Sequence, residues 1–467
     1  MLGYAYRMSS LETHADALST PGETQTTNNA PLRSRVLNLA WPVIAENLLE
    51  TMLGIVDTAL VGVLGVSAIA GVGAAQQAQF LLISVLAALS IGCAVLVAQA
   101  VGAKDLARAS QLARQSLLWS VVISIPLAVI GFLLARSFIG IFGMDAAATE
   151  MGTHYVQVTM GTVVVLVALL IGSGVLRGAG DSRTPFIVTA IANVINLPLA
   201  YGLINGALGL PNLGAVGSAW ATFIARGVAL VLLLMALWRG RNGVSIRQGV
   251  GWHLDVSVIK QVLTIGVPAA IEQILTTLSF TALTILVGSL GTATLAAHRL
   301  VITITSFSFL PGFGFSIATT SLVGQAIGAK RFQDITPIAR IAAIWAVIWM
   351  GAIGVLLILF APQALRIFTQ DPEVINAGQT AIRMLGFAQA FWAVQGVCSG
   401  GMRGMGDTRS PLILFAGGLW ATVGLAWVLL NTFHGGLVSV WAAFLISTPI
   451  ITALMLWRFR QIVRQLK

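Results

Sequence analysis

The stretch LNLAWPVIAENLLETMLGIVDTALVGVLG, residues 37–65, is apolar enough to cross a bilayer but carries three carboxylates, Glu46, Glu50 and Asp57. At about 100° per residue these positions fall within roughly 40° of each other, so one helix face is acidic over about 16 Å. Each charge costs about 2.5–3.5 kcal/mol at the bilayer centre on insertion scales. Any one acid can be explained by a buried cation or by proximity to the membrane surface. Three on one face indicate a function beyond anchoring.

The composition is that of a membrane protein with many spans. Of the 467 residues, 57% are hydrophobic and 9% charged, and the mean hydropathy is +0.91. Soluble proteins have about 25% charged residues. The net charge of +10 would suggest nucleic acid in a soluble chain. Here the basic residues lie between apolar runs, where they set topology, so we expect a lipid bilayer and no nucleic acid as partner.

Twelve apolar runs of about 20 residues predict an all-α integral membrane protein with twelve transmembrane helices. Their expected extents are 37–62, 68–98, 116–140, 151–173, 185–206, 214–238, 261–287, 293–324, 338–361, 375–398, 411–431 and 436–457. Residues 1–32 are mostly polar and lack the apolar core of a signal peptide, so they predict a disordered cytoplasmic tail. Most of the 26 lysines and arginines lie on the same side as this tail, so we expect both termini to be cytoplasmic.

The sequence is duplicated. WPVIAEN (41–47) matches VPAAIEQ (267–273), VAQAVGAK (97–104) matches VGQAIGAK (323–330), and RGAGDSRTP (177–185) matches RGMGDTRSP (403–411), all at an offset of 226. Later, GAVGSAW (214–220) pairs with GGLVSVW (435–441) at an offset of 221. Six spans per repeat is an even number, so the two six-helix lobes share one orientation and are related by a parallel pseudo-two-fold repeat.

This duplication divides the chain into five expected segments. They are the tail 1–32, an N-lobe 33–238, a cytoplasmic inter-lobe linker 239–260, a C-lobe 261–457 and a basic cytoplasmic tail 458–467.

The two RGxGDxRxP loops are glycine-rich, but they lack the Gly-Lys-Ser/Thr ending and the preceding strand of a nucleotide site. We interpret them as structural elbows. Thr184-Pro185 and Ser410-Pro411 are expected to supply an N-cap and a first-turn proline, and Asp181 and Asp407 to pair with neighbouring arginines.

No catalytic constellation is present in the sequence. HExxH, GxSxG and clustered Cys/His patterns are all missing, and His298 stands alone in its span. We therefore predict neither an enzyme nor a bound cofactor.

The eighth span contains Pro311-Gly312-Phe313-Gly314 where the second has Val85-Leu86-Ala87-Ala88. Proline removes a backbone donor and glycines permit bending, so we expect a bend here, with Pro311 and Phe313 as candidate cleft residues. A static kink is the alternative.

Pro42, VDTALVGVLG (56–65), the duplicated elements and NLPLAYGLINGALGLPNLGAVGSAWAT (196–222) together resemble the multidrug and toxic compound extrusion (MATE) family. The match covers nearly the whole chain after residue 30. The resemblance implies two lobes around a central cleft, alternating access, and export of organic, often cationic, compounds against Na⁺ or H⁺ entry. It also implies that Asp57 is the cation-site aspartate of the first helix and Asn196 the asparagine of the fifth.

Two positions depart from the family pattern. Ala200 stands where the family often has an acid or amide, and Thr276 stands at a position that is acidic in some branches. These departures favour the DinF-like branch over the NorM branch and leave the choice between H⁺ and Na⁺ open.

We therefore predict a cation-coupled efflux antiporter for small cationic or amphipathic compounds, in a plasma or bacterial inner membrane and monomeric. A lipid-linked precursor flippase of the same wider superfamily is the alternative, although such flippases tend to have more spans and a more basic cleft. A channel would need no coupling acid, and a membrane enzyme lacks catalytic residues.

Glu46 and Glu272 occupy equivalent positions in the two repeats, and Gln273 follows the second. They are candidate cleft residues that attract cationic substrates, or else they make structural hydrogen bonds.

Glu50 and Arg226 both fall near mid-membrane, and their repeat equivalents are Thr276 and Ser447. Because both charges are replaced together, we predict a buried structural pair.

Asp57 is then left without an obvious cation, and its repeat equivalent is Leu283. We predict that it binds the coupling ion, H⁺ or Na⁺, with Asn196, Thr58 and Thr222 supplying neutral oxygens. Beyond this Na⁺ option we predict no metal. The alternative is a protonated aspartate that only bonds two helices together.

Overall fold

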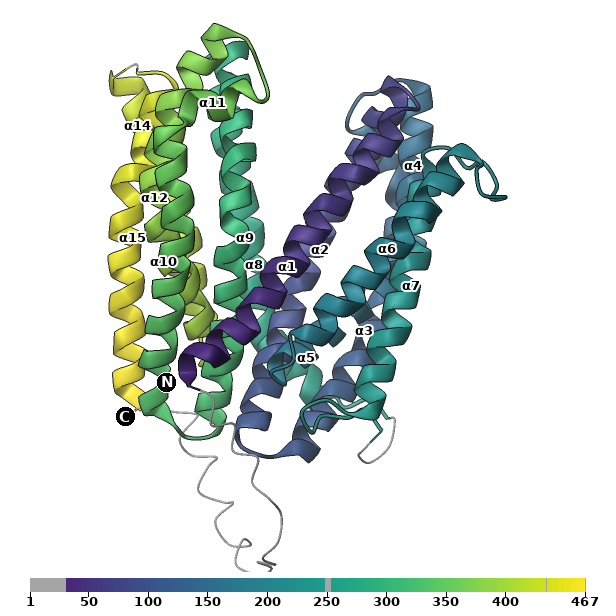
Figure 1. Ribbon diagram of the computed structural model, residues 1–467, viewed down its shortest axis with the longest axis vertical. Coiled ribbons are helices and arrows are strands. Elements are labelled where there is room, and N and C mark those ends of the chain that lie inside the picture. Colours follow the sequence, from purple (N-terminus) through teal and green to yellow (C-terminus); the bar gives the residue numbers. More distant parts are fainter. Residues whose placement is uncertain (1–30, 248–252, 434, 467) are drawn as a thin grey trace, which may run out of the picture. The chain divides into compact units, whose positions relative to one another are not determined.

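The computed structural model describes residues 31–247, 253–433 and 435–466, and Leu32–Lys467 forms one compact unit. Within the described residues the only extended pairing is a single bridge between Arg241 and Val244, and all other regular structure is helical (Figure 1). The first repeat holds α1 (Leu32–Gly62), α2 (Val66–Gly102), α3 (Leu106–Gly140), α4 (Ala146–Gly161), α5 (Val163–Gly178), α6 (Arg183–Asn205) and α7 (Val216–Arg239). The second holds α8 (Val256–Gly288), α9 (Thr292–Gly328), η1 (Phe332–Asp334), α10 (Ile335–Leu359), α11 (Ala361–Arg366), α12 (Pro372–Gly404), α13 (Arg409–Pro411), η2 (Leu412–Ala416), α14 (Gly417–Phe433) and α15 (Leu437–Leu466).

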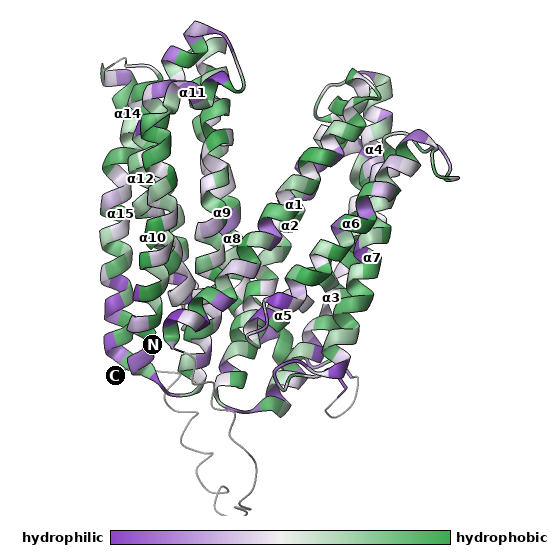
Figure 2. Ribbon diagram, in the orientation of Figure 1, coloured by the Kyte–Doolittle hydropathy of each residue, from purple (hydrophilic) through white to green (hydrophobic). Residues whose placement is uncertain are grey.

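Eleven of the twelve predicted spans correspond to helices, or to one bent pair of helices, that are long and apolar enough to cross a bilayer. Among the described residues, ten helical segments are long and apolar enough to cross a bilayer, and α4 with α5 makes an eleventh span that is bent by 52°. The twelfth is α12, whose 33 residues extend about 50 Å but include buried amides such as Gln389 and Gln395. Apolar residues dominate the middle of the helices and hydrophilic residues gather toward their ends (Figure 2).

Each lobe takes the start of the other lobe's first helix into its core. Val36, Leu39 and Ala40 of α1 belong to a cluster built otherwise from α9, α10, α12 and α15. Reciprocally, the opening turns of α8 belong to a cluster built mainly from α2, α3, α5, α6 and α7; these α8 residues are Val258, Ile259 and Val262. The predicted boundaries 33–238 and 261–457 therefore divide the sequence, but the packing crosses them, because the starts of α1 and α8 are exchanged.

The elbow after each repeat's fourth span is closed by its aspartate. Asp181 accepts hydrogen bonds from the backbone N–H and the hydroxyl of Thr184 at 3.0 and 2.6 Å. Asp407 does the same for Ser410 at 2.9 and 2.6 Å. The capping oxygens thus come from the aspartates and not, as expected, from Thr184 and Ser410. Asp407 does have an arginine partner, but it is Arg458 of α15, 3.6 Å from the carboxylate, and not one of the neighbouring arginines that were expected.

Helix α9 runs through Pro311 without a break, so the predicted bend in the eighth span, if present, lies within one continuous helix. The glycines beside Pro311 serve packing: a Cβ on Gly312 would meet Met350, and a Cβ on Gly314 would meet Ile44 of α1. The span that does break is the one at Thr162, between α4 and α5.

The linker and the C-terminus also differ from expectation. Of the linker 239–260, residues 248–252 lie outside the described residues, and α8 already begins at Val256. Asp255 caps that helix, and hydrogen bonds from Ser257 hold the pKa of its carboxyl below the ordinary value. The segment 458–467 was expected as a tail, but α15 continues through it to Leu466. The predicted N-terminal tail lies outside the described residues, except that Leu32 begins α1.

Candidate functional site

Asp57 lies inside the first lobe and is almost fully buried. Its carboxylate accepts a hydrogen bond from the Ser218 hydroxyl of α7 at 2.5 Å. Tyr155 of α4 adjoins both Ser218 and Asp57. The hydrogen bond described for this carboxylate comes from one neutral donor, and the structure describes no ion pair for it within 4 Å.

Asn196 and Thr222 join this site through α7. Asn196, which is 2% exposed, donates from its amide to the Thr222 hydroxyl at 3.2 Å, linking α6 to α7. Ser218 and Thr222 are four residues apart and so share one face of α7. The partner of Asp57 and the partner of Asn196 are therefore neighbours, and three of the four predicted coupling residues come together.

The fourth predicted coupling residue, Thr58, does not take part. Its hydroxyl donates to the Gly54 carbonyl of its own helix at 2.8 Å, and the residue is exposed. Positions 57 and 58 are about 100° apart on α1, so the two side chains cannot face the same partner helix. Ser218 was not predicted, although it stands in the family-like stretch one turn before Thr222.

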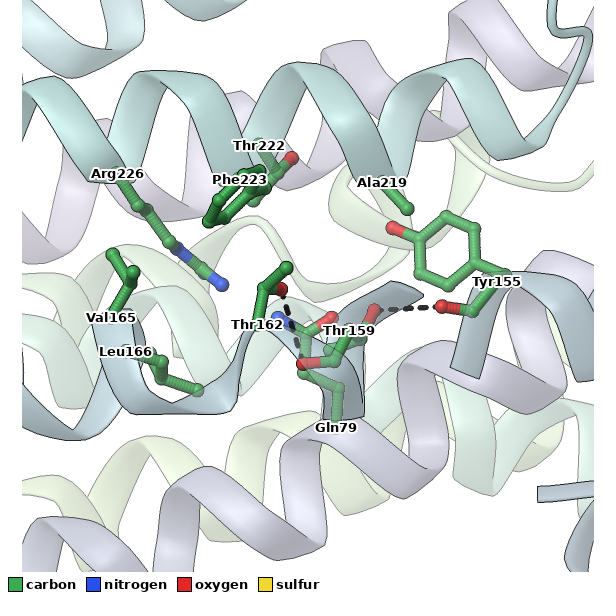
Figure 3. A pocket seen from close by; sticks show the side chains of 10 residues that line it. All are labelled: Gln79, Tyr155, Thr159, Thr162, Val165, Leu166, Ala219, Thr222, Phe223 and Arg226. Atoms are coloured by element: carbon green, nitrogen blue, oxygen red, sulfur yellow. Dashed lines mark hydrogen bonds between the residues drawn. The ribbon is translucent and has the colours of Figure 1, made fainter. Parts of the chain in front are cut away.

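A small polar cavity of about 20 Å³, the size of one water site, lies beside this cluster (Figure 3). Its lining combines one arginine with hydroxyl and amide groups from α2, α4, α7 and the break at Thr162, and with apolar side chains from α5 and α7. These residues are Gln79, Tyr155, Thr159, Thr162, Thr222 and Arg226, together with Val165, Leu166, Ala219 and Phe223. Figure 3 shows the Arg226 side chain extending toward Thr162, the residue at the break between α4 and α5. The broken span therefore opens onto the same polar space as the Asp57 cluster.

The predicted direct pair between Glu50 and Arg226 is not formed. In the described part of the chain no ion pair joins them within 4 Å. Arg226 points into the cavity instead, where it interacts electrostatically with both Glu50 and Asp57 of α1. Its charge is thus shared between two acids.

Glu46 and Glu272 each bind an arginine. Arg177 lies 2.7 Å from Glu46, and Arg403 lies 2.7 Å from Glu272. Both carboxylates are about 4% exposed. The arginines open the two RGxGDxRxP elements, and the sequence separation is 131 residues in both pairs. That equal spacing is the signal that could have identified the partners.

The other candidate cleft residues lie apart from this cluster. Gln273 is half-buried and its carbonyl accepts from Thr277. Pro311 is buried in α9, whereas Phe313 is 57% exposed. The structure describes no hydrogen bond or ion pair that connects these three side chains to Asp57.

The donor set at Asp57 suits a proton or Na⁺. It offers one carboxylate and the neutral oxygens of Ser218, Thr222 and Asn196. Among the described residues no group of three or more His, Cys, Asp and Glu side chains could hold a metal ion. An oxygen site with one negative charge can bind a monovalent cation and become neutral.

The MatE family model matches residues 42–202 and 268–428. The two matched segments have the same length and the same 226-residue offset as the duplicated motifs. The first repeat's Asp57 and Asn196 therefore align with Leu283 and Thr422 in the second.

Curated relatives align over nearly the whole chain. The chain is 30% identical over 415 residues to a probable multidrug resistance protein NorM of Thermotoga maritima, covering 88% of each. It is also 30% identical over 461 residues to a multidrug resistance protein NorM of Burkholderia vietnamiensis, covering 95% of this chain and 97% of the relative. These names give no support to the expected DinF-like branch.

Among solved structures, the fold matches one titled as the outward-facing conformation of a multidrug resistance MATE family transporter of the MOP superfamily. The TM-score is 0.86 at 23% identity, and the match covers 95% of this chain and 99% of that one.

Proposed function

Because this chain belongs to the MatE family of transporters, we propose that it is a secondary active exporter that exchanges small organic compounds for H⁺ or Na⁺. The family consists of transporters, so no enzymatic reaction is assigned to it. The observation that carries the proposal is the buried Asp57 carboxylate, which accepts a hydrogen bond from the neutral Ser218 hydroxyl and which the second repeat replaces with Leu283.

Ion binding at Asp57 changes the charge inside the first lobe by one unit. With the site empty, the carboxylate interacts with Ser218 and with the charge of Arg226. With a proton or Na⁺ bound, the site is neutral, and Arg226 is left with Glu50 as its remaining acidic neighbour on α1. Coupling requires only that the outward-facing and inward-facing arrangements of the lobes differ in affinity for the ion.

The substrates proposed are cationic or amphipathic organic compounds; the multidrug resistance relatives support organic compounds in general. Glu46 and Glu272 are neutralised by arginines, so they are weaker candidates for attracting cations than Glu50, which is exposed. We propose a monomer in a bacterial inner membrane, with the basic helix ends and both termini cytoplasmic.

The test is efflux of the cationic dye ethidium from proteoliposomes under separately imposed H⁺ and Na⁺ gradients. The wild-type protein is expected to respond to one of them. Asp57→Asn removes the titratable charge but keeps the shape, and is expected to lower gradient-driven export more than 10-fold while the protein still inserts and folds. Glu150→Gln is the matched control, because Glu150 is an exposed acid with a side chain 76% exposed. Full export by Asp57→Asn would remove Asp57 from the mechanism.

A further inference from the structure

Two glutamines connect the lobes through symmetric hydrogen bonds. The Gln99 amide of α2 donates to the Gly404 carbonyl of α12 at 3.2 Å. The Gln325 amide of α9 donates to the Gly178 carbonyl of α5 at 3.1 Å. Each bond joins one repeat to the other. The two donors, Gln99 and Gln325, are 226 residues apart, and so are the two acceptors, Gly178 and Gly404.

The acceptors are helix-end carbonyls. Gly178 is the last residue of α5 and Gly404 the last of α12. The final carbonyls of a helix have no partner within it, so they are available to a donor from outside. Each glutamine thus satisfies a helix end of the opposite lobe.

The same region brings backbones into direct contact. A Cβ on Gly102, the last residue of α2, would overlap the Gln325 carbonyl, and a Cβ on Gly328, the last residue of α9, would overlap the Gln99 carbonyl. The glycines of VAQAVGAK and VGQAIGAK are therefore needed for the close approach that lets each glutamine reach its acceptor.

Each acceptor adjoins an ion-paired arginine. Arg177 precedes Gly178 and binds Glu46 of α1, while Arg403 precedes Gly404 and binds Glu272 of α8. These ion pairs stay within one lobe, whereas the glutamine bonds cross between lobes. The crossing bonds are neutral amide–carbonyl contacts, each worth about a 2- to 10-fold change in an equilibrium. They are weak enough to break and re-form in each cycle.

We propose that Gln99 with Gly404 and Gln325 with Gly178, closed over the Gly102–Gly328 contact, form the cytoplasmic gate of this transporter. The gate must open when the lobes change from outward-facing to inward-facing. This inference rests on the proposed alternating access. The Glu46–Arg177 and Glu272–Arg403 pairs position each acceptor carbonyl relative to the first helix of its lobe.

The test measures the gate distance directly. Spin labels on Ala107→Cys and Gln333→Cys, two exposed positions 226 residues apart, report the separation of the lobes in nanodiscs by pulsed electron paramagnetic resonance. The native Cys93 and Cys398 are buried. Gln99→Ala or Gln325→Ala is expected to raise the open-to-closed ratio about 2- to 10-fold, and the double variant by the product of the two.

Gly102→Ala with Gly328→Ala is expected to shift the gate further toward the open distance. The matched control is Gly140→Ala with Gly288→Ala, which also changes the last residues of two helices but has open space around both. If the glycine variant fails to fold, the glutamine variants decide. Distance distributions that match the wild type in the double glutamine variant would overturn the gate.

Ethidium efflux by the wild type separates this inference from the proposed function. A gate that opens in the variants while the wild type exports nothing under either gradient supports the gate and contradicts the proposed exchange. If the wild type exports ethidium while the variants keep the wild-type distances, the proposed exchange is supported and the gate is contradicted.

Discussion

The two lobes share a plan but not their charges. Both have a Glu–Arg pair at 2.7 Å, an aspartate-capped elbow and a glutamine reaching the opposite lobe. Deeper in the membrane they diverge: the N-lobe has Asp57 and Arg226, where the C-lobe has Leu283 and Ser447. The shared elements maintain the architecture, because they occur wherever the helix arrangement is repeated. The unshared charges cannot be required by that arrangement.

The C-lobe replaces the charged cluster with a neutral one. Thr422, which aligns with Asn196, donates to Ser447 at 2.7 Å, so the two corresponding helices are still connected by a side-chain hydrogen bond. A polar link between these helices is therefore part of the fold in both lobes, and the carboxylate is specific to one of them.

The largest expected effect is a loss of stability when one partner of a buried Glu–Arg pair is removed, and this loss should differ between the two lobes. Removing one partner of a buried pair costs about 3–5 kcal/mol, so Arg403→Ala should lower stability by that amount. Arg177→Ala should cost less, because Glu46 also accepts from Thr189 at 3.4 Å, whereas one oxygen of Glu272 has no partner. Thermal unfolding in detergent compares the two variants. Adding Glu272→Ala to Arg403→Ala should restore most of the loss, and no recovery would show that the pair is not the cause.

Leu283→Asp tests whether the C-lobe tolerates a carboxylate at the position equivalent to Asp57 of the N-lobe. Leu283 is 1% exposed. An acid at the bilayer centre costs about 2.5–3.5 kcal/mol on insertion scales, so we expect a loss of that order in unfolding free energy. Leu283→Asn carries a similar shape without the charge and is the control. A Leu283→Asp protein as stable as the wild type would mean that the lobes do not differ electrostatically.

Asn196→Ala and Thr422→Val remove the corresponding hydrogen bonds in the two lobes. Each should lower the unfolding free energy by about 0.5–1.5 kcal/mol. Only Asn196→Ala should also change the H⁺ or Na⁺ concentration that gives half-maximal efflux, because only it adjoins the Asp57 site. Equal effects of both variants on ion dependence would contradict the assignment of ion binding to one lobe.

The smallest expected difference is between the two elbow caps. Asp181→Ala and Asp407→Ala should each cost about 1 kcal/mol through loss of the cap. Asp407→Ala should cost up to about 1 kcal/mol more, because its carboxylate also lies 3.6 Å from Arg458. Unfolding at low and high salt isolates this addition, which should fade as salt screens the pair.

The sequence predicted the twelve spans, the two repeats and the burial of Asp57 with Asn196 and Thr222. These depend on apolar length, on motif spacing and on one family-like stretch, all of which are local properties. The partners of Glu46 and Glu272 were not predicted, since charge in a loop indicates topology before it indicates contact. The predicted Glu50–Arg226 pair was wrong for a similar reason. The two residues were inferred to lie at equal depth from their positions in the helices, but depth does not determine where a long side chain points. Arg226 extends into a cavity.

The break between α4 and α5 was not predicted, whereas the bend at Pro311 stays a prediction, because a continuous helix can still bend at a proline. Pro311 is a strong local signal, yet neighbouring helices pack against Gly312 and Gly314 and keep α9 continuous. Thr162, where the span does break, has no proline around it, although Gly161 precedes it and Val163, Val164 and Val165 follow it. Its hydroxyl donates to the Val158 carbonyl at 2.8 Å, as Thr153 and Thr159 do to carbonyls four residues earlier inside α4, so this bond alone does not explain the break.

The exchange of the α1 and α8 starts gives the two repeats the geometry of a domain-swapped homodimer joined into one chain. In such a dimer, each subunit completes its partner's interior with its own N-terminal segment, and the same surface is used on both sides of the axis. A half-length chain would be left with Val36, Leu39 and Ala40, or Val258, Ile259 and Val262, without the core that receives them. The two halves therefore complete each other's cores, and joining them in one chain keeps them at a fixed one-to-one ratio.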